Sequence, residues 1–241
     1  MCNPLLRKPL VAVSALPRPV STGYGPDEAD TVAKCFITAV LEAGGLPVVL
    51  PVIPGELAEL QLEPFDALIL TGGQDLATPE AFEDPKRWID PARDEHELSL
   101  WEAAHQRGLP ILGVCRGAQL AGFAAGDRGI RGVEGHNAAE QHETERHTVD
   151  VEEGTSLAKV LGAGKVEVNT LHSQAVTEVA GGLRISARAR DGTVEAIENP
   201  EPNRFIGVQW HPELMLDSPA GQPLFDWVVE SARRGTDRTR T

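Results

Sequence analysis

Cys115 stands between Gly113 and Gly117, directly after the apolar run Ile111–Val114. A cysteine buried in a core needs no glycine beside it, but a cysteine presented on a sharp turn does, because side chains there would collide. Gly-x-Cys-x-Gly between a strand and a helix is typical of a nucleophile elbow with sulfur in place of oxygen. The N-terminus of the following helix would favour the thiolate. The pattern predicts a reactive cysteine, although a buried cysteine at a strand end would show the same short motif.

The stretch "GVQWHPE" near the C-terminus supplies a candidate base for this cysteine. Pro212 biases His211 toward an extended conformation, in which side chains two positions apart point the same way. The carboxylate of Glu213 could then fix the tautomer and the orientation of the imidazole. Taken by itself, the stretch fits equally a strand that ends at a proline, with both side chains in solvent.

A third motif, "LILTGGQDL", places Gly72 and Gly73 directly after an apolar run. Backbone N–H groups can approach a ligand closely at such a position because no side chain intervenes. Alone, the motif usually marks a turn.

In this order along the chain, the three motifs resemble the class I glutamine amidotransferase superfamily. Within it the chain is most similar to the gamma-glutamyl-gamma-aminobutyrate hydrolases, which are gamma-glutamyl hydrolase-type cysteine peptidases. The stretches that carry the resemblance run from about Leu41 to Glu213: "LEAGGLPVVLP", "LILTGGQDL", "RDEHEL", "GLPILGVCRGAQL", "VNTLHSQAV", "DGTVEAIE" and "IGVQWHPE".

The resemblance implies roles for individual residues. Cys115, His211 and Glu213 would form a catalytic triad, and the backbone N–H groups of Arg116 and Gly73 would hold an oxyanion. Substrate contacts carried over from the family fall on three further side chains, Gln119, His172 and Ser173.

The activity that the resemblance implies is hydrolysis of the gamma-glutamyl amide of a small amine, as in amine or polyamine metabolism, with release of glutamate through a gamma-glutamyl thioester. One alternative is a glutaminase subunit that supplies ammonia to a separate synthase, and another is a binding module without activity. Ser173 resembles the glutamine-using branch, whereas Arg116 resembles the hydrolase branch, which "RDEHEL" and "VNTLH" also favour. We therefore expect the hydrolase.

The remaining chain indicates the elements that must position these residues. Apolar runs at Leu10–Val13, Leu46–Val52, Phe65–Thr71 and Ile111–Val114 alternate with helical patterns, which predicts a mostly parallel sheet covered on both faces. The resemblance implies an α/β three-layer sandwich with a flavodoxin-like central sheet. We expect a loop at Leu16–Glu28, helices at Asp27–Ala43, Gly117–Ala125 and Pro223–Ser231, and strands at His147–Val151, Lys165–Val168, Leu183–Ala187, Val194–Ile197 and Phe205–Trp210. We expect one domain over residues 1–241, with a frayed tail over 233–241.

Composition excludes several classes of protein. The 241 residues carry a formal net charge of −14, which argues against binding to nucleic acid. Three cysteines do not make a disulfide framework, and no apolar run is long enough to span a membrane, so the sequence predicts a cytoplasmic protein. The expected partner is a small-molecule gamma-glutamyl substrate; oligomeric state is left open, with a homodimer as one arrangement.

The polar, glycine-rich segment Gly126–His147 departs most from the family pattern. We expect it to form a loop over the active-site side and to influence which amine is accepted. It contains His136, His142 and His147, but their spacing is irregular and the expected chemistry needs no metal or other cofactor, so the sequence predicts no metal site.

Overall fold

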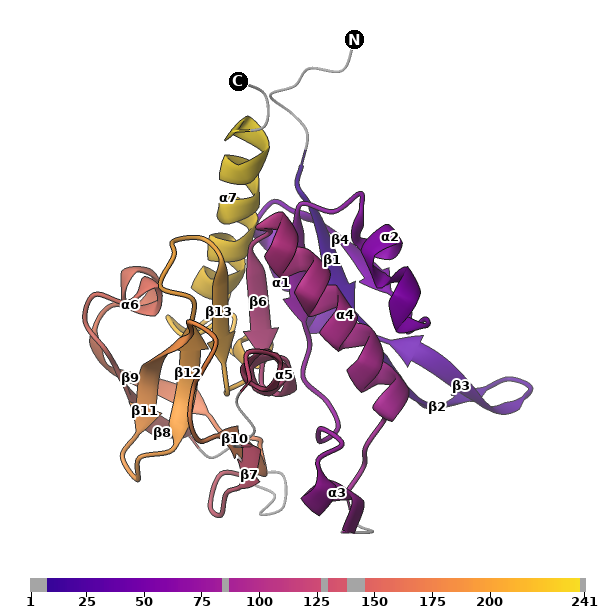
Figure 1. Ribbon diagram of the computed structural model, residues 1–241, viewed down its shortest axis with the longest axis horizontal. Helices are drawn as coiled ribbons and strands as arrows, with labels where there is room; N and C mark the ends of the chain where they lie inside the picture. Colours follow the sequence, from indigo (N-terminus) through magenta and orange to yellow (C-terminus); the bar gives the residue numbers. More distant parts are fainter. Residues whose placement is uncertain (1–7, 84–86, 127–129, 138–145, 239–241) are drawn as a thin grey trace.

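The computed structural model describes residues 8–83, 87–126, 130–137 and 146–238. Its centre is a nine-stranded sheet with the strand order β4-β1-β5-β6-β13-β12-β11-β8-β9 (Figure 1). The strands are, in that order, Leu46–Leu50, Leu10–Ser14, Ala67–Leu70, Ile111–Val114, Phe205–Val208, Val194–Glu198, Arg184–Ala189, Arg146–Val151 and Gly164–Asn169. The five strands from β4 to β13 pair in parallel, and the remaining neighbours pair antiparallel.

Helices cover both faces of the sheet, as the sequence predicts. One face packs against α1 (Lys34–Glu42), α6 (Ser156–Leu161) and α7 (Gln222–Arg238), and the other against α2 (Ala58–Leu62), α4 (Pro91–Arg107) and α5 (Arg116–Ala124). In β5, Ile69 faces the first layer, whereas Leu68 and Leu70 face the second. Because both sets are buried, the parallel strands read as continuous apolar runs rather than as alternating ones. The α/β three-layer fold class is confirmed.

Several short elements lie between the main strands and helices. The helix α3 (Pro79–Glu83) follows the Gly72–Gly73 loop, and two single turns of 3-10 helix, η2 and η4, span Gly55–Leu57 and Pro212–Leu214. The strands β7 (Ile130–Gly132) and β10 (Gln174–Val176) form a small antiparallel pair below the carboxyl ends of the main strands (Figure 1). No described helix is both long enough and apolar enough to cross a lipid bilayer.

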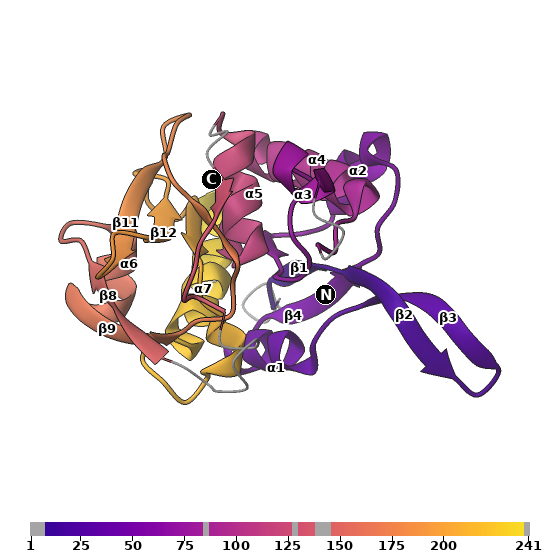
Figure 2. The same ribbon diagram turned by 90° about the horizontal axis from the view of Figure 1, so that it is seen from below.

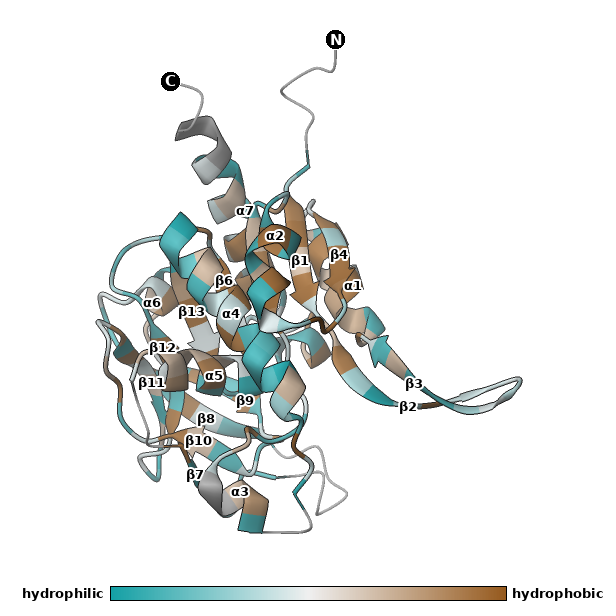
Figure 3. Cartoon of the chain, turned by 45° about the vertical axis from the view of Figure 1, so that its right-hand side comes forward, coloured by the Kyte–Doolittle hydropathy of each residue, from teal (hydrophilic) through white to brown (hydrophobic). Residues whose placement is uncertain are grey.

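The expected loop at Leu16–Glu28 is instead part of a β-hairpin, which is a correction to the sequence prediction. Strands β2 (Leu16–Thr22) and β3 (Gly25–Thr31) pair along their whole length and project from the body of the protein (Figure 2). The hairpin has polar residues on both faces and two prolines in β2, so it lacks the alternation that identifies a strand (Figure 3). For the same reason the predicted helix at Asp27–Ala43 starts too early, since α1 begins at Lys34.

Two further boundaries differ from expectation. The last helix continues to Arg238, beyond the predicted end at Ser231, while 239–241 lie outside the described residues. Fraying of the tail over 233–241 stays a prediction. The segment Gly126–His147 is not wholly a loop, because β7 lies within it and pairs with β10. Residues 127–129 and 138–145 of that segment, including His142, lie outside the described residues.

Candidate active site

Cys115 occupies the sharp turn between β6 and α5. Its backbone has φ 50° and ψ −104°, a conformation that residues other than glycine rarely adopt. A Cβ atom at Gly113 would lie 2.9 Å from the backbone nitrogen of Ala118, and one at Gly117 would lie 2.2 Å from the carbonyl oxygen of Leu70. Both glycines are therefore required where the sequence has them, because they let α5 start directly against β5 and β6. The structure confirms the elbow.

His211 and Glu213 lie beyond the carboxyl end of the neighbouring strand β13. His211 Nδ1 and Glu213 Oε1 are 2.6 Å apart, so the expected contact is confirmed. The backbone that brings the two side chains together is not the extended strand that the sequence predicts. β13 already ends at Val208, and Glu213 lies in the 3-10 turn η4. The bond to Nδ1 leaves Nε2, the other ring nitrogen, available for another partner.

The imidazole of His211 faces Cys115 across Gly72. A Cβ atom at Gly72 would lie 2.8 Å from His211 Cε1 and 3.5 Å from Cys115 Cβ, so glycine keeps open the space between the two side chains. Burial lowers the pKa of His211, but the negative charges of Cys115 and Glu213 and the hydrogen bonds to both outweigh it and hold this pKa well above its ordinary value. The site is thus built to keep an imidazolium beside the sulfur.

Asn169, at the end of β9, holds the backbone of His211 from the opposite side. The His211 N–H donates to Asn169 Oδ1 at 2.8 Å, and Asn169 Nδ2 donates to the His211 carbonyl oxygen at 2.9 Å. The preceding residue, Trp210, is fully buried and donates from Nε1 to the Ala220 carbonyl oxygen at 3.0 Å. These bonds fix the position from which the imidazole reaches Cys115.

The Gly72–Gly73 loop is held from below by Arg93, a fully buried residue of α4. Its Nη2 donates to Thr71 Oγ1 at 2.9 Å and to the Gly72 carbonyl oxygen at 3.1 Å, and its Nη1 donates to Gln74 Oε1. Gly73 has φ 145°, and a Cβ atom there would lie 2.5 Å from Arg93 Nη1. Glycine is needed at position 73 both for this backbone conformation and for the close approach of the guanidinium.

The same helix also holds the elbow through Arg116. The Arg116 guanidinium is buried and donates to Glu97 and Asp94, while Glu97 Oε1 accepts from Arg93 Nε at 2.9 Å. Burial raises the pKa of Glu97, but the positive charges of Arg116 and Arg93 outweigh this and hold it below its usual value. Glu97 is therefore an ionised carboxylate that links the residue after Cys115 to the glycine loop.

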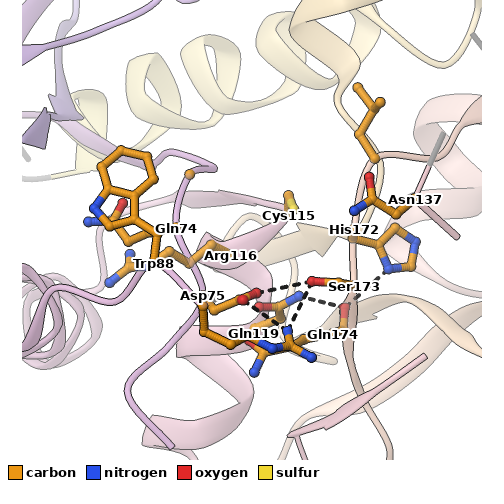
Figure 4. Close-up of a pocket in the computed structure, with 13 residues that line it drawn as sticks. Gln74, Asp75, Trp88, Cys115, Arg116, Gln119, Asn137, His172, Ser173 and Gln174 are labelled. Atoms are coloured by element: carbon orange, nitrogen blue, oxygen red, sulfur yellow. Dashed lines mark hydrogen bonds and ion pairs between the residues drawn. The ribbon is translucent and has the colours of Figure 1, made fainter. Parts of the chain in front are cut away.

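A cavity of about 400 Å³ opens beside Cys115 (Figure 4). One wall carries an ion pair between Arg87 Nη1 and Asp75 Oδ2 at 2.9 Å. Ser173 Oγ bridges both, accepting from Arg87 Nη1 at 3.0 Å and donating to Asp75 Oδ1 at 3.2 Å. This wall presents one positive and one negative group to whatever occupies the cavity.

Gln119, His172 and Ser173, the expected substrate-binding residues, all line this cavity. Ser173 alone is part of the charged wall. Gln119 Nε2 donates to the Gln174 carbonyl oxygen at 2.8 Å and to Gln209 Oε1 at 3.1 Å, and Gln209 Nε2 lies 3.5 Å from Cys115 Sγ. His172 Nδ1 contacts the same Gln174 carbonyl at 3.1 Å. Substrate contact by these three residues stays a prediction.

Sequence reasoning gave no role to Arg93, Asp94, Glu97 or Asn169. All four lie in stretches that carried the family resemblance, "RDEHEL" and "VNTLH". An arginine directly after Cys115 is the signal that could have found Asp94 and Glu97, since a buried arginine needs buried carboxylates. Glu97 stands one helical turn beyond Arg93, where such a partner would be expected.

The sequence was compared with known proteins. A model of the family Peptidase C26 matches residues 9–213. The chain belongs to the peptidase C26 family. This C26 protein is 36% identical over 236 residues to the "Putative glutamine amidotransferase Rv2859c" of Mycobacterium tuberculosis, covering 93% of this chain and 75% of the relative. It is 33% identical over 201 residues to the gamma-glutamyl-gamma-aminobutyrate hydrolase PuuD of Escherichia coli, covering 76% and 78%.

A solved structure supports the fold. It is described as a "putative gmp synthase subunit a protein" from Thermoplasma acidophilum, and it superposes with a TM-score of 0.68 over 98% of this chain and 100% of its own. At 15% identity the likeness concerns the fold alone. The family and the sequence relatives make this C26 protein a hydrolase of the glutamine-amidotransferase-like type.

Proposed function

We propose that this C26 protein cleaves the gamma-glutamyl amide of a small amine and releases glutamate, with Cys115 as nucleophile, His211 as acid and base, and Glu213 as the group that orients the imidazole. The observation that carries the proposal is the elbow itself. A strained turn presents Cys115 to a cavity, with an imidazole already fixed by a carboxylate on its other side. A binding module without chemistry would not need this strain.

The reaction begins when the Cys115 thiolate attacks the γ-carbonyl carbon and forms a C–S bond, while the carbonyl π electrons move to oxygen. Collapse of this intermediate breaks the C–N bond, and the His211 imidazolium gives its proton to the departing amine. The product is a gamma-glutamyl thioester. Neutral His211 then removes a proton from water, which attacks the thioester, and glutamate and the thiolate–imidazolium pair are regenerated.

The oxyanion formed in each step needs donors that are already in place. We assign this role to the backbone N–H groups of Arg116, at the start of α5, and of Gly73. Both groups stand on segments that α4 holds through Arg93 and Glu97. The donors therefore belong to a rigid frame and need little reorganisation during the reaction.

The charged wall of the cavity suits the α-amino acid end of a gamma-glutamyl substrate. A zwitterion carries one carboxylate and one ammonium group, which Arg87 and Asp75 can bind respectively, with Ser173 between them. This assignment agrees with a cavity of about 400 Å³, which suits a small molecule. Asn137, which also lines the cavity, is our candidate for the amine side.

The test is glutamate release by the purified chain from a panel of gamma-glutamyl amines and from glutamine, without ATP or a second protein. We expect hydrolysis of at least one gamma-glutamyl amine at a much higher kcat/KM than that of glutamine. Cys115→Ala should abolish turnover, and His211→Ala should lower kcat by about 10²–10⁴-fold. Cys35→Ala is the matched control, because Cys35 lies on α1 and does not line the cavity.

The alternative of a glutaminase subunit gives a different result in the same assay. Pure protein would then be inactive on the whole panel and would hydrolyse glutamine only after a synthase is added. Normal activity in Cys115→Ala would instead reject the nucleophile assignment.

A further inference from the structure

Beside the cavity, four side chains from separate parts of the chain lie close together. Glu195, on β12, is completely buried. Its Oε1 lies 3.2 Å from His136 Nδ1, 3.3 Å from His147 Nε2 and 3.5 Å from His172 Nε2. The rings pack together as well, with centroids 5.0 Å apart for His136 and His147 and 4.9 Å apart for His136 and His172.

The facing atoms of these four side chains make no hydrogen bonds to the described residues. This holds for both carboxylate oxygens of Glu195 and for the facing nitrogen of each of the three histidines. An unpartnered buried carboxylate is costly, and three unpartnered imidazole nitrogens around it make the cost larger. Since the distances are short, the missing hydrogen bonds reflect the direction of approach and not a separation of the groups.

The outer nitrogens of two of these histidines already have partners of their own. His136 Nε2 lies 2.8 Å from Asp191 Oδ2, and His172 Nδ1 lies 3.1 Å from the Gln174 carbonyl oxygen. A carbonyl oxygen can only accept, so the proton of neutral His172 is on Nδ1 and its Nε2 carries a lone pair. Metal-binding histidines typically have a carboxylate or carbonyl on the second nitrogen in this manner.

We propose that His136, His147 and Glu195 bind a divalent transition-metal ion, with Zn²⁺ as the first candidate. Their facing donor atoms all lie within 4.8 Å of one another. Two imidazole nitrogens and one carboxylate oxygen are ligands that zinc accepts, and they leave one tetrahedral position for a further donor. Bonds of about 2.0–2.1 Å to a central zinc place neighbouring donor atoms roughly 3.4 Å apart. The distances from Glu195 Oε1 to His136 Nδ1 and to His147 Nε2, 3.2 and 3.3 Å, lie at this spacing.

A simple ion pair accounts for only part of the cluster. His136 lies within ion-pair distance of both Glu195 and Asp191, so this one histidine can pair with both carboxylates. It leaves His147 and His172 directed at the same Glu195 oxygen without hydrogen-bond geometry. A cation between His136, His147 and Glu195 satisfies the facing atoms of all three at once.

The site would fasten the cavity wall to the main sheet. His147 and Glu195 stand on sheet strands β8 and β12, whereas His136 and His172 flank the small β7–β10 pair. The latter two are already linked, because the His172 N–H donates to the His136 carbonyl oxygen at 2.9 Å. A metal ion there acts as a structural support for the segment that carries Ser173, and takes no part in bond cleavage.

The sequence argument against a metal considered only His136, His142 and His147, whose spacing is irregular. The proposed donors are two of these together with Glu195, which is separated from them in sequence by the intervening strands. Fold topology, which the spacing does not reveal, brings the three together.

The test is the metal content of the intact purified chain, measured by mass spectrometry after dialysis, and its affinity for added Zn²⁺. We expect one zinc ion per chain in the wild type, and a thousandfold excess of Zn²⁺ over the dissociation constant should raise Tm by roughly 10 °C. His147→Ala and Glu195→Gln should each lose the metal and this increase. His105→Ala is the matched control, because His105 stacks on Trp101 of α4, away from the cluster, and it should retain both.

Replacement of zinc by Co²⁺ gives a second readout that does not depend on activity or on Tm. The wild type and His105→Ala should show the visible absorption of tetrahedral Co²⁺, and His147→Ala should not. His147 is 23% exposed, so this variant should fold, which circular dichroism can verify. The proposal is overturned if the wild type binds none of Zn²⁺, Co²⁺, Mn²⁺ or Fe²⁺, or if folded His147→Ala binds them as the wild type does.

Discussion

Gly117 and Gly122 allow a controlled test of the elbow, because both lie on α5 and alanine is intrinsically favoured over glycine in a helix by about 1 kcal/mol. Their surroundings differ. A Cβ atom at position 117 would lie 2.2 Å from the Leu70 carbonyl oxygen, which belongs to the backbone of a central strand and cannot turn away. At position 122 the nearest atom is a Val176 methyl group at 3.1 Å, which needs to shift only slightly.

Gly117→Ala must therefore move the start of α5 by about 1 Å to reach ordinary contact. We expect a loss of about 1–3 kcal/mol in the free energy of unfolding, which for a chain of this size lowers Tm by roughly 2–4 °C per kcal/mol. Displacement of a nucleophile by about 1 Å lowers kcat by about 100-fold. Gly122→Ala should stay within about 1 kcal/mol of the wild type and keep its kcat.

The assays are thermal unfolding, steady-state glutamate release, and the rate at which iodoacetamide alkylates Cys115. A lower alkylation rate in Gly117→Ala would show that the elbow itself is displaced and not only that the fold is weakened. Wild-type values of Tm and kcat in Gly117→Ala would refute the argument, because the 2.2 Å approach would then have no consequence.

Three other perturbations test the supports of the site. Asn169→Ala removes both hydrogen bonds to the backbone of His211, so steady-state kinetics should show kcat lowered by about 10–100-fold with little change in KM. A change in KM alone would contradict this. Arg116→Met leaves the buried carboxylate of Glu97 without one of its partners and should lower the free energy of unfolding, measured by urea denaturation, by about 3–5 kcal/mol. An unchanged free energy of unfolding would show that Arg93 alone is enough to stabilise the Glu97 carboxylate. Because the native pKa of His211 lies well above the unfolded value near 6.5, its contribution to stability is complete below that pH and is lost as pH rises through the native pKa. Between pH of about 7 and 9, Tm should therefore fall more steeply for the wild type than for His211→Gln, and equal slopes would exclude the shifted pKa.

The elements that carry the site could be predicted from the sequence because each is marked by two independent signals. Ile111–Val114 is a buried parallel strand, so it is apolar throughout, and it is followed by glycines that the turn requires; the structure reproduces its bounds without change. The hairpin β2–β3 has neither signal, since it projects from the body of the protein and pairs polar segments that bury little surface. Local pattern cannot identify a strand whose side chains face solvent on both sides.

Residues that support the site were harder to find than residues that would react. Cys115 and His211 stand in short motifs whose spacing reflects local backbone geometry. The partners of Asn169 are 42 residues away in sequence, and those of Arg116 are 19 and 22 residues away. Such contacts depend on which strands are neighbours in the sheet, and a single sequence does not contain that information.

The arrangement around α4 gives a physical reason for an arginine directly after Cys115. One of the two oxyanion donors that we propose stands at the start of α5, and the other stands on the loop that follows β5. Glu97 binds Arg116 at the first position and Arg93 beneath the second, so one buried carboxylate ties the two segments together.

A buried ion pair contributes little net stability, because desolvation offsets the attraction between the charges. Its advantage is directional: a guanidinium between carboxylates and carbonyl groups has few alternative positions. The Arg93–Glu97–Arg116 network is thus better understood as a device that fixes two backbone N–H groups relative to Cys115 than as a source of folding energy.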